Sequence, residues 1–195
     1  MLVAFEGGEG TGKSTQARIL AERLGAVLTH EPGATTAGAR IREVLLDPAA
    51  TIDARTEALL MAADRAQHLA EIVGPALALG RDVVTDRYLY SSLAYQSYGR
   101  GLDRREVRHL SAFAGAPEAD LVLLITVSPG ERARRVKAEP DRIEASGAAF
   151  HQRVEEGFHA LAAADPHRWV VIDGDGPMGD VAEKVWAAVE AHSLP

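Results

Sequence analysis

The chain has 195 residues, of which 47% are apolar and 25% are charged, and its formal net charge is −7. This length and composition predict one globular domain with a substantial core. The acidic balance argues against a general nucleic-acid-binding protein, which usually has a basic face. Because the chain has no cysteine, disulfides and thiolate sites are excluded.

Nothing in the sequence suggests a leader or a membrane span. The N-terminus shows no basic region followed by a long apolar run, and the longest apolar run, Leu121 to Ile125, is too short to cross a bilayer. We therefore expect a cytoplasmic location and neither a membrane nor a nucleic acid as a partner.

Five apolar runs alternate with helical patterns: Leu2–Phe5, Ala26–Thr29, Val83–Thr85, Leu121–Val127 and Trp169–Ile172. Consecutive apolar residues indicate strands that are buried on both faces. Strands that alternate with helices indicate right-handed crossovers and a parallel sheet. The predicted fold class is α/β, with a doubly wound, parallel five-stranded sheet flanked by helices in a single domain over residues 1–195.

The first strand leads into the stretch from Gly7 to Ser14, which matches G-x-x-x-x-G-K-[ST], the phosphate-binding loop or P-loop. Glycines let backbone N–H groups approach an anion, and the following helix adds its positive end. Lysine supplies a charge to the outer phosphates, and the serine hydroxyl can bind Mg²⁺. A chance glycine-rich turn lacks the flanking strand and helix, so we predict ATP binding by Gly7, Gly8, Glu9, Gly10, Thr11, Gly12, Lys13, Ser14 and Thr15.

Helical patterns follow. The first covers Lys13 to Leu24 and ends at Gly25, and a short one covers Ala37 to Leu46. A longer one begins near Asp53, and Gly74-Pro75 is a candidate kink. Its predicted apolar stripe comprises Leu59, Ala62, Ala66, Leu69, Val73 and Leu77, and its opposite edge carries Asp64, Arg65, Gln67 and His68.

The third strand ends in Asp86-Arg87-Tyr88. A carboxylate at the end of a buried strand is where P-loop enzymes hold Mg²⁺, so Ser14 and Asp86 are the predicted metal ligands. The alternative is that Asp86 caps the next helix. Arg87 follows at the edge where ligands bind in open α/β sheets, and an exposed salt-bridge arginine is its alternative.

The next helix is rich in tyrosine, and helices follow over Asp103 to Ala114, Phe150 to Ala164 and Val181 to Ala191. Aromatic side chains there could stack on a base or sugar, or could belong to the core. After the fourth strand, the chain becomes basic within a predicted lid at about residues 131–146. The cluster is either a solvated face or a set of guanidinium groups that close on a transferring phosphate, and it comprises Arg132, Arg134, Arg135, Lys137 and Arg142. The histidines show no metal-binding spacing and are interpreted as surface or capping residues.

Several motifs together resemble the thymidylate kinase family over nearly the whole chain. They are Glu6 to Thr15, Glu31-Pro32-Gly33-Ala34-Thr35, Ala63 to Gln67, Asp86-Arg87-Tyr88 with Ser91 to Gln96, and Asp141-Arg142-Ile143-Glu144. The resemblance implies transfer of the γ-phosphoryl group of ATP to dTMP, with Mg²⁺, in a homodimer. The P-loop has no arginine between its glycines, as in the bacterial form, in which lid arginines supply catalytic charge.

The resemblance also implies residue roles. Lys13, Arg87 and two lid arginines, for which we choose Arg135 and Arg142, are the expected catalytic residues. The expected substrate-binding residues are Glu9 near the acceptor sugar, Met61, Arg65 at the thymine edge, Arg87 on the acceptor phosphate, Ser92 near the base, Tyr95 under the deoxyribose, and Gln96.

Three departures from the family pattern concern these roles. Met61 stands where the family usually has phenylalanine, and methionine can still cover a ring face. Ala34 replaces a common glycine. Lys137-Ala138 replaces a frequent lid Arg-Gly, so the choice of catalytic lid arginine stays open.

Two other activities compete with this interpretation. A deoxynucleoside kinase phosphorylates a 5′-hydroxyl and needs a carboxylate base, for which Glu31 is the candidate. Two arginines, Arg65 and Arg87, are more than a neutral acceptor needs. A P-loop ATPase switch protein, the second alternative, would have no second small-molecule pocket.

Overall fold

The centre of the molecule is a parallel five-stranded sheet in the order β2-β3-β1-β4-β5. The computed structural model describes residues 1–136 and 139–193. All five predicted strands are present, each within a residue or two of its expected bounds, as β1 (Leu2–Glu6), β2 (Val27–His30), β3 (Val83–Asp86), β4 (Leu121–Thr126) and β5 (Trp169–Asp173). The predicted α/β fold class is therefore confirmed.

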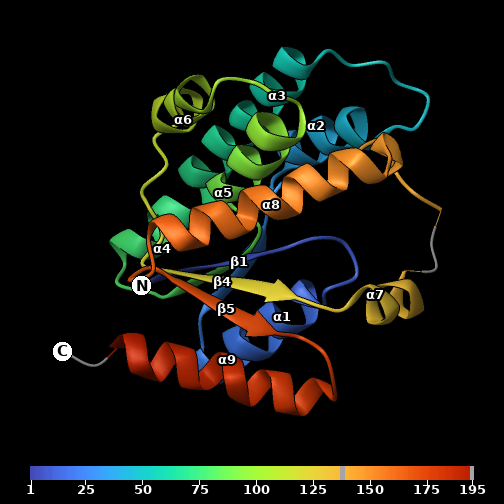
Figure 1. Cartoon of the computed structure of the whole chain (residues 1–195). Helices are drawn as coiled ribbons and strands as arrows, with labels where there is room; N and C mark the ends of the chain where they lie inside the picture. The colour runs from blue at the N-terminus through green and yellow to red at the C-terminus, as the bar shows by residue number, and fades with distance from the viewer. Residues whose placement is uncertain (137–138, 194–195) are drawn as a thin grey trace.

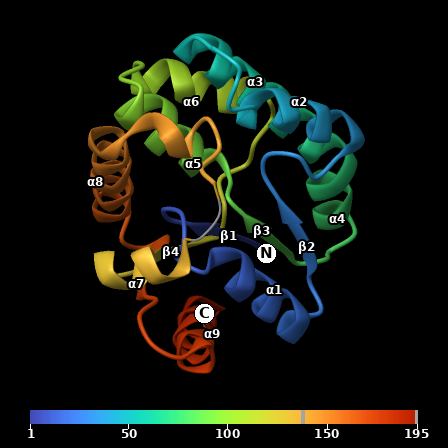
Figure 2. The same ribbon diagram turned by 90° about the vertical axis from the view of Figure 1, so that its right-hand side faces the viewer.

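Helices cover both faces of the sheet (Figures 1 and 2). Two of them, α1 (Lys13–Leu24) and α9 (Met178–Ser193), lie on one face. The remaining helical elements lie on the opposite face or around the carboxyl edge: α2 (Thr36–Leu46), α3 (Ala54–His68), η1 (Leu69–Val73), α4 (Gly74–Ala78), α5 (Leu89–Ser92), η2 (Leu93–Gly99), α6 (Arg104–Phe113), α7 (Pro129–Arg135), η3 (Glu144–Ser146) and α8 (Ala148–Ala164). Among the described residues, no helix combines the length and apolar character needed for a membrane span.

The strands bury side chains on both faces, as their uninterrupted apolar sequences predict. In β1, Leu2 and Ala4 belong to the core under α8, whereas Val3 and Phe5 belong to the core under α1 and α9. This division follows from the two-residue period of a strand. The sheet thereby becomes a rigid platform for the loops that follow its strands.

The carboxyl edge of the sheet brings the P-loop and the end of β3 together. Strands β1 and β3 pair in parallel, with Phe5 opposite Asp86. The P-loop therefore begins beside Asp86 and Arg87, although about 80 residues separate them in the sequence. Strand β1 pairs with β3 on one side and with β4 on the other, so the later strands are added on opposite sides of it. This is the switch point at which ligands bind in open α/β sheets.

The helix that begins at residue 54 buries a set of residues that differs from the predicted apolar stripe. Leu59, placed in the apolar stripe, is 56% exposed, whereas Asp64, Arg65 and His68, placed on the opposite edge, are buried. Arg65 and His68 bond to partners from other elements, and Asp64 Oδ1 accepts from the backbone N–H of Gly33, whereas Asp64 Oδ2 has no partner among the described residues. The predicted stripe is therefore wrong at Leu59 but correct at Leu69 and Val73, which are buried in the core. The predicted kink also differs, because the π-helical stretch η1 precedes Gly74 and α4 continues from there.

A second π-helical stretch, η2, runs along α8. Glycines at the contact permit this approach: a Cβ on Gly99 would lie 2.5 Å from Cε2 of Phe150, and a Cβ on Gly157 would lie 2.7 Å from Cγ of Tyr98. Such distances leave no room for another side chain. Helix α8 therefore backs the segment that carries Tyr95 and Gln96.

Candidate active site

The P-loop connects β1 to α1 through glycines that other residues cannot replace. Gly7 has φ = 136°, and a Cβ there would collide with the carbonyl oxygen of Ile125. Gly12, the N-cap of α1, has φ = 89°. These conformations favour glycine. They bring the N-terminus of α1 directly behind the loop, where its unpaired N–H groups favour an anion.

Lys13 is buried in this loop. Its Nζ donates to the carbonyl oxygen of Gly8 at 2.6 Å and to Thr11 Oγ1 at 3.4 Å. Burial, assisted by repulsion from Arg87, lowers the pKa of Lys13 to about 8, although Asp86 acts in the opposite direction. An anion bound at the loop would favour the charged form of Lys13 and raise its pKa again.

Ser14 and Asp86 meet at the predicted metal position. Ser14 Oγ donates a hydrogen bond to Asp86 Oδ2, and Asp86 Oδ1 is buried without a hydrogen-bond partner among the described residues. Helix α5 begins after Tyr88 with no side-chain cap, so the interpretation of Asp86 as a helix cap is wrong. In the described part of the chain no three histidine or acidic residues gather into a metal site. Two oxygen ligands fit Mg²⁺ that completes its shell with water and phosphate.

Arg87 follows β3 in a left-handed backbone conformation, with φ = 70°. One terminal nitrogen donates to the carbonyl oxygen of Gly7 at 3.0 Å and to Ser91 Oγ at 3.1 Å, and the other donates to Tyr95 Oη at 3.3 Å. Burial favours the neutral form, but Tyr95 and Asp86 raise the pKa of Arg87 above its ordinary value. Arg87 is thus a partly buried, permanently charged group at the P-loop, and not an exposed salt-bridge arginine.

Glu6 fixes the turn that carries Arg87. This buried carboxylate accepts hydrogen bonds from the backbone N–H groups of Tyr88 and Ser91, at 3.0 and 3.1 Å, and from Ser91 Oγ at 2.5 Å. Burial raises the pKa of Glu6 to about 7, despite the opposing hydrogen bonds and the charge of Arg87. Because Ser91 also accepts from Arg87, Glu6 holds the guanidinium through Ser91.

A cavity of about 590 Å³ opens beside the P-loop. Its size suits a nucleotide-sized ligand. Residues predicted as P-loop, metal and substrate ligands line it together: Glu9, Lys13, Ser14, Met61, Arg65, Asp86, Arg87, Ser92, Tyr95 and Gln96. The structure thus brings the predicted acceptor residues into one pocket next to the phosphate-binding loop, and a switch protein would need no such pocket.

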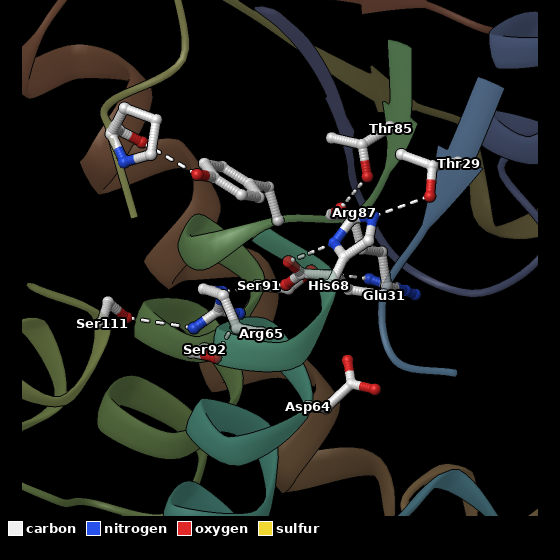
Figure 3. A network of polar contacts seen from close by, with 12 residues as sticks. Thr29, Glu31, Asp64, Arg65, His68, Thr85, Arg87, Ser91, Ser92 and Ser111 are labelled. Atoms are coloured by element: carbon white, nitrogen blue, oxygen red, sulfur yellow. Dashed lines mark hydrogen bonds and ion pairs between the residues drawn. The ribbon is translucent and has the colours of Figure 1, made fainter. Parts of the chain in front are cut away.

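Arg65 reaches the cavity from α3 and is held on three sides (Figure 3). Its Nε donates to Glu31 Oε2 at 2.8 Å, and its two terminal nitrogens donate to Ser111 Oγ and Ser92 Oγ, each at 3.0 Å. Its side chain is only 3% exposed. The charge is therefore fixed in place by the protein before any ligand binds.

Glu31 lies between Arg65 and His68 (Figure 3). His68 contacts Glu31 Oε1 through Nδ1 at 2.9 Å and Thr29 Oγ1 through Nε2 at 2.6 Å. His68 is fully buried, so its interpretation as a surface or capping residue is wrong. Both carboxylate oxygens of Glu31 are committed to structural partners, which makes it a poor general base for a 5′-hydroxyl.

The tyrosines after Arg87 divide between core and cavity. Tyr88 and Tyr90 are buried in the core, whereas Tyr95 is partly buried and lines the cavity. The ring of Tyr95 packs edge-on against Phe150 and Phe158, with centroid distances of 6.0 and 6.1 Å. These two contacts hold the ring of Tyr95 in one orientation.

The arginines of the basic cluster lie in different parts of the structure. Arg135, at the end of α7, donates to the carbonyl oxygens of Thr11 at 3.2 Å and Gly174 at 2.9 Å, and its Nε donates to Glu131 at 2.7 Å. Arg132 lies over the P-loop too, since a Cβ on Gly8 would be 3.2 Å from it. Lys137 lies outside the described residues.

Arg142 lies elsewhere, at the side of α2 and α3. It donates to Glu57 Oε2 at 2.8 Å and to the carbonyl oxygen of Leu45 at 2.8 Å. Of the two predicted lid arginines, the structure thus brings only Arg135 to the P-loop.

Comparisons with known proteins identify the family of the chain. Residues 5–185 match the family model described as thymidylate kinase. The chain therefore belongs to the thymidylate kinase family. It is 45% identical to a thymidylate kinase of Synechococcus sp. (strain JA-2-3B'a(2-13)), covering 97% of this chain and 94% of that one. It is 42% identical to a thymidylate kinase of Deinococcus radiodurans, over 97% of this chain and 96% of that one.

A solved structure extends this agreement to the fold of the family. The crystal structure of thymidylate kinase from Ehrlichia chaffeensis superposes with a TM-score of 0.81 at 31% identity, and the match covers 97% of this chain and 98% of that one.

Three buried groups of this thymidylate kinase family member had no role in the predicted site. They are Glu6, His68 and Glu57, each with little or no exposed surface. A carboxylate that ends an apolar strand, as Glu6 does, is a signal that sequence reasoning could have used. The partners of His68 and Glu57 come from distant segments, so their roles had no local signal.

Proposed function

We propose that this chain transfers the γ-phosphoryl group of ATP to dTMP, giving ADP and dTDP. Membership of the thymidylate kinase family supports the reaction. The observation that carries the assignment of the acceptor is Arg87, a partly buried cation in a nucleotide-sized cavity beside the P-loop. A planar guanidinium can bind a phosphate with two parallel hydrogen bonds, which a neutral hydroxyl acceptor does not require.

On the donor side, the residues from Gly7 to Thr15 surround the ATP phosphates. Lys13 gives up its contacts with Gly8 and Thr11 and binds the outer phosphate oxygens. Ser14 and Asp86 hold Mg²⁺, which neutralises charge on the phosphates when bound. The buried, unpartnered Asp86 Oδ1 supports this role.

On the acceptor side, each group has one task. Arg87 binds the 5′-phosphate, and Arg65 and Ser92 lie at the base edge with Gln96. Tyr95 lies under the deoxyribose, where its fixed ring would crowd a 2′-hydroxyl, and Met61 covers a base face one helical turn before Arg65. Glu9, an exposed residue that lines the cavity, would lie near the acceptor sugar and could contact the bound metal.

The transfer needs position and charge more than proton chemistry. A phosphate monoester has a second pKa near 6, so at neutral pH the acceptor is mostly a dianion and can attack without a base. Repulsion between two polyanions is the main obstacle, and Lys13 and Arg87 reduce it. The commitment of Glu31 to Arg65 and His68 argues against the nucleoside kinase alternative.

For the lid, we propose that residues of about 131–146 close over the phosphates with Arg135 as the catalytic arginine. Its contact with the carbonyl oxygen of Thr11 supports this choice. Arg142, which the sequence prediction also chose, is better suited to anchoring the end of the lid to Glu57.

We also infer a homodimer that forms through α2, α3 and α6, three helices that pack side by side (Figure 1). They carry Val44, Leu59 and Phe113, which are 51%, 56% and 93% exposed. Exposed large apolar side chains on one helical layer suit a protein interface. Phe113→Asp should yield a monomer by light scattering, whereas Leu79→Asp, at another exposed apolar position, should not.

The acceptor assay tests the proposed reaction. ADP formation is measured with dTMP, with thymidine and with neither acceptor, in the wild type and in Arg87→Ala. Loss of a hydrogen bond to a charged group should lower kcat/KM for dTMP by about 10- to 150-fold, with little change in ATP affinity. The exposed Arg81→Ala is the matched control. Faster transfer to thymidine than to dTMP would refute the proposal, and ATP hydrolysis indifferent to any acceptor would indicate the switch protein.

A further inference from the structure

Glu57 is a buried carboxylate outside the machinery described above. It lies on α3, one helical turn before Met61, and is 1% exposed. It joins three segments that are far apart in the sequence. Its Oε1 accepts from Gln96 at 3.0 Å and from Arg100 Nε at 3.1 Å, and its Oε2 accepts from Arg100 at 3.0 Å and from Arg142 at 2.8 Å.

The charge of Glu57 is secured by these partners. Burial alone would raise its pKa, but the hydrogen bonds from Arg100, Gln96 and Arg142 hold the pKa below its ordinary value. An ionised carboxylate accepts hydrogen bonds and cannot donate them. The side-chain amide of Gln96 can therefore face Glu57 only with its NH₂ group.

This constraint fixes what Gln96 offers to a ligand. Gln96 is 1% exposed and lines the cavity, and with its Nε2 bound to Glu57 the remaining polar atom is Oε1. Oε1 is buried and has no hydrogen-bond partner in the described part of the chain. A buried acceptor of this kind favours a ligand that brings a donor to it.

We infer that Glu57 is a positioning residue that fixes the Gln96 amide and thereby selects the acceptor base, an inference that rests on the proposed function. Thymine carries a donor, N3–H, at its pairing edge, whereas cytosine carries an acceptor, N3, at the same place. With Nε2 of Gln96 held by Glu57, Oε1 is the atom left for a base in the cavity, so thymine gains a hydrogen bond and cytosine meets two opposed lone pairs. Glu57 thus acts through Gln96 and touches no substrate atom.

The test compares two acceptors that share the 5-methyl group, sugar and phosphate: dTMP and 5-methyl-dCMP. The readout is the ratio of their kcat/KM values within each variant, so the fraction of folded enzyme cancels. In Glu57→Gln, the new amide can donate or accept, and Gln96 can turn either way. We expect the preference for dTMP to fall by about 5- to 150-fold, the range for leaving one buried polar group unpaired.

The matched control is Glu118→Gln. Glu118 also accepts from two arginines, Arg108 and Arg168, but not from Gln96, and the ratio should not change in this variant. Action through Gln96 is tested in the Gln96→Leu background, where adding Glu57→Gln should leave the ratio as it is. If Glu57→Gln fails to fold, Glu57→Gln with Arg142→Gln removes a buried anion and a buried cation together, and the ratio should still fall.

Three results would overturn the inference. They are an unchanged ratio in folded Glu57→Gln, an equal fall in the Gln96→Leu background, and a wild type that uses both acceptors equally. Each of these leaves transfer to dTMP intact. A wild type that phosphorylates neither acceptor would instead refute the proposed function.

Discussion

The lowered pKa of Lys13 predicts that ATP binding depends on pH. In the free protein, Lys13 titrates at about 8 instead of at its ordinary value of 10.5. Bound phosphates remove the cause of this shift and favour the charged form. If the bound pKa returns to its ordinary value, ATP affinity falls by about eightfold between pH 7.5 and pH 9, because binding then requires proton uptake.

Calorimetry in two buffers of different ionisation enthalpy measures this proton directly. At pH 9 the free lysine is mostly neutral and the bound lysine mostly charged, so binding should take up about 0.9 proton per ATP. The γ-phosphate, with a second pKa near 6, is already ionised over this range. Lys13→Arg, which stays charged, should show neither effect. Flat affinity and negligible proton uptake by the wild type would refute the argument.

Three further predictions concern the lid, the sugar and the fold. Arg135→Ala should lower kcat by about 100- to 1000-fold in steady-state assays, as loss of a preorganised charge does, while the exposed neighbour Arg134→Ala should not. Tyr95→Ala should reduce the preference for dTMP over ribothymidylate by about 10- to 200-fold, and Tyr95→Phe should retain it. Glu6, whose pKa rises to about 7 in the fold, contributes stability at low pH that is lost as the pH rises through 7. In urea unfolding, the stability of Glu6→Gln relative to wild type should therefore increase by on the order of 3 kcal/mol from pH 5 to pH 8, and a constant difference would exclude this role.

The sheet and the P-loop could be predicted because their signals are local. Buried parallel strands are apolar on consecutive residues, and the glycines of the loop meet backbone requirements that no other residue meets, as Gly7 shows beside Ile125. The first helix, Lys13–Leu24, has the predicted bounds. These features depend on short segments and on chain geometry, which a single sequence contains in full.

The face of α3 could not be predicted because most of its buried residues are polar. Helical periodicity assumes that charged residues face water, and Arg65 is buried only because Glu31 neutralises it from a distant loop. The position of Arg142 could not be predicted from the sequence either. It lies near the lid arginines in the sequence, yet its partner is Glu57 on α3, so sequence proximity did not indicate its place.

The wide turns of η2 have a consequence for how this chain can vary in length. A π-helical stretch holds more residues per turn than an α-helix, and such stretches are frequent at functional sites. Deleting one residue between Leu93 and Gly99 would convert the stretch to an ordinary helix and leave the flanking residues in register. An insertion cannot be absorbed in this way, because the stretch already holds extra residues, and it would rotate everything after it by about 100°. Arg100 would then turn away from Glu57, and the glycine that fits against Phe150 would be replaced at the contact by a residue with a side chain. We therefore expect this segment not to tolerate an insertion.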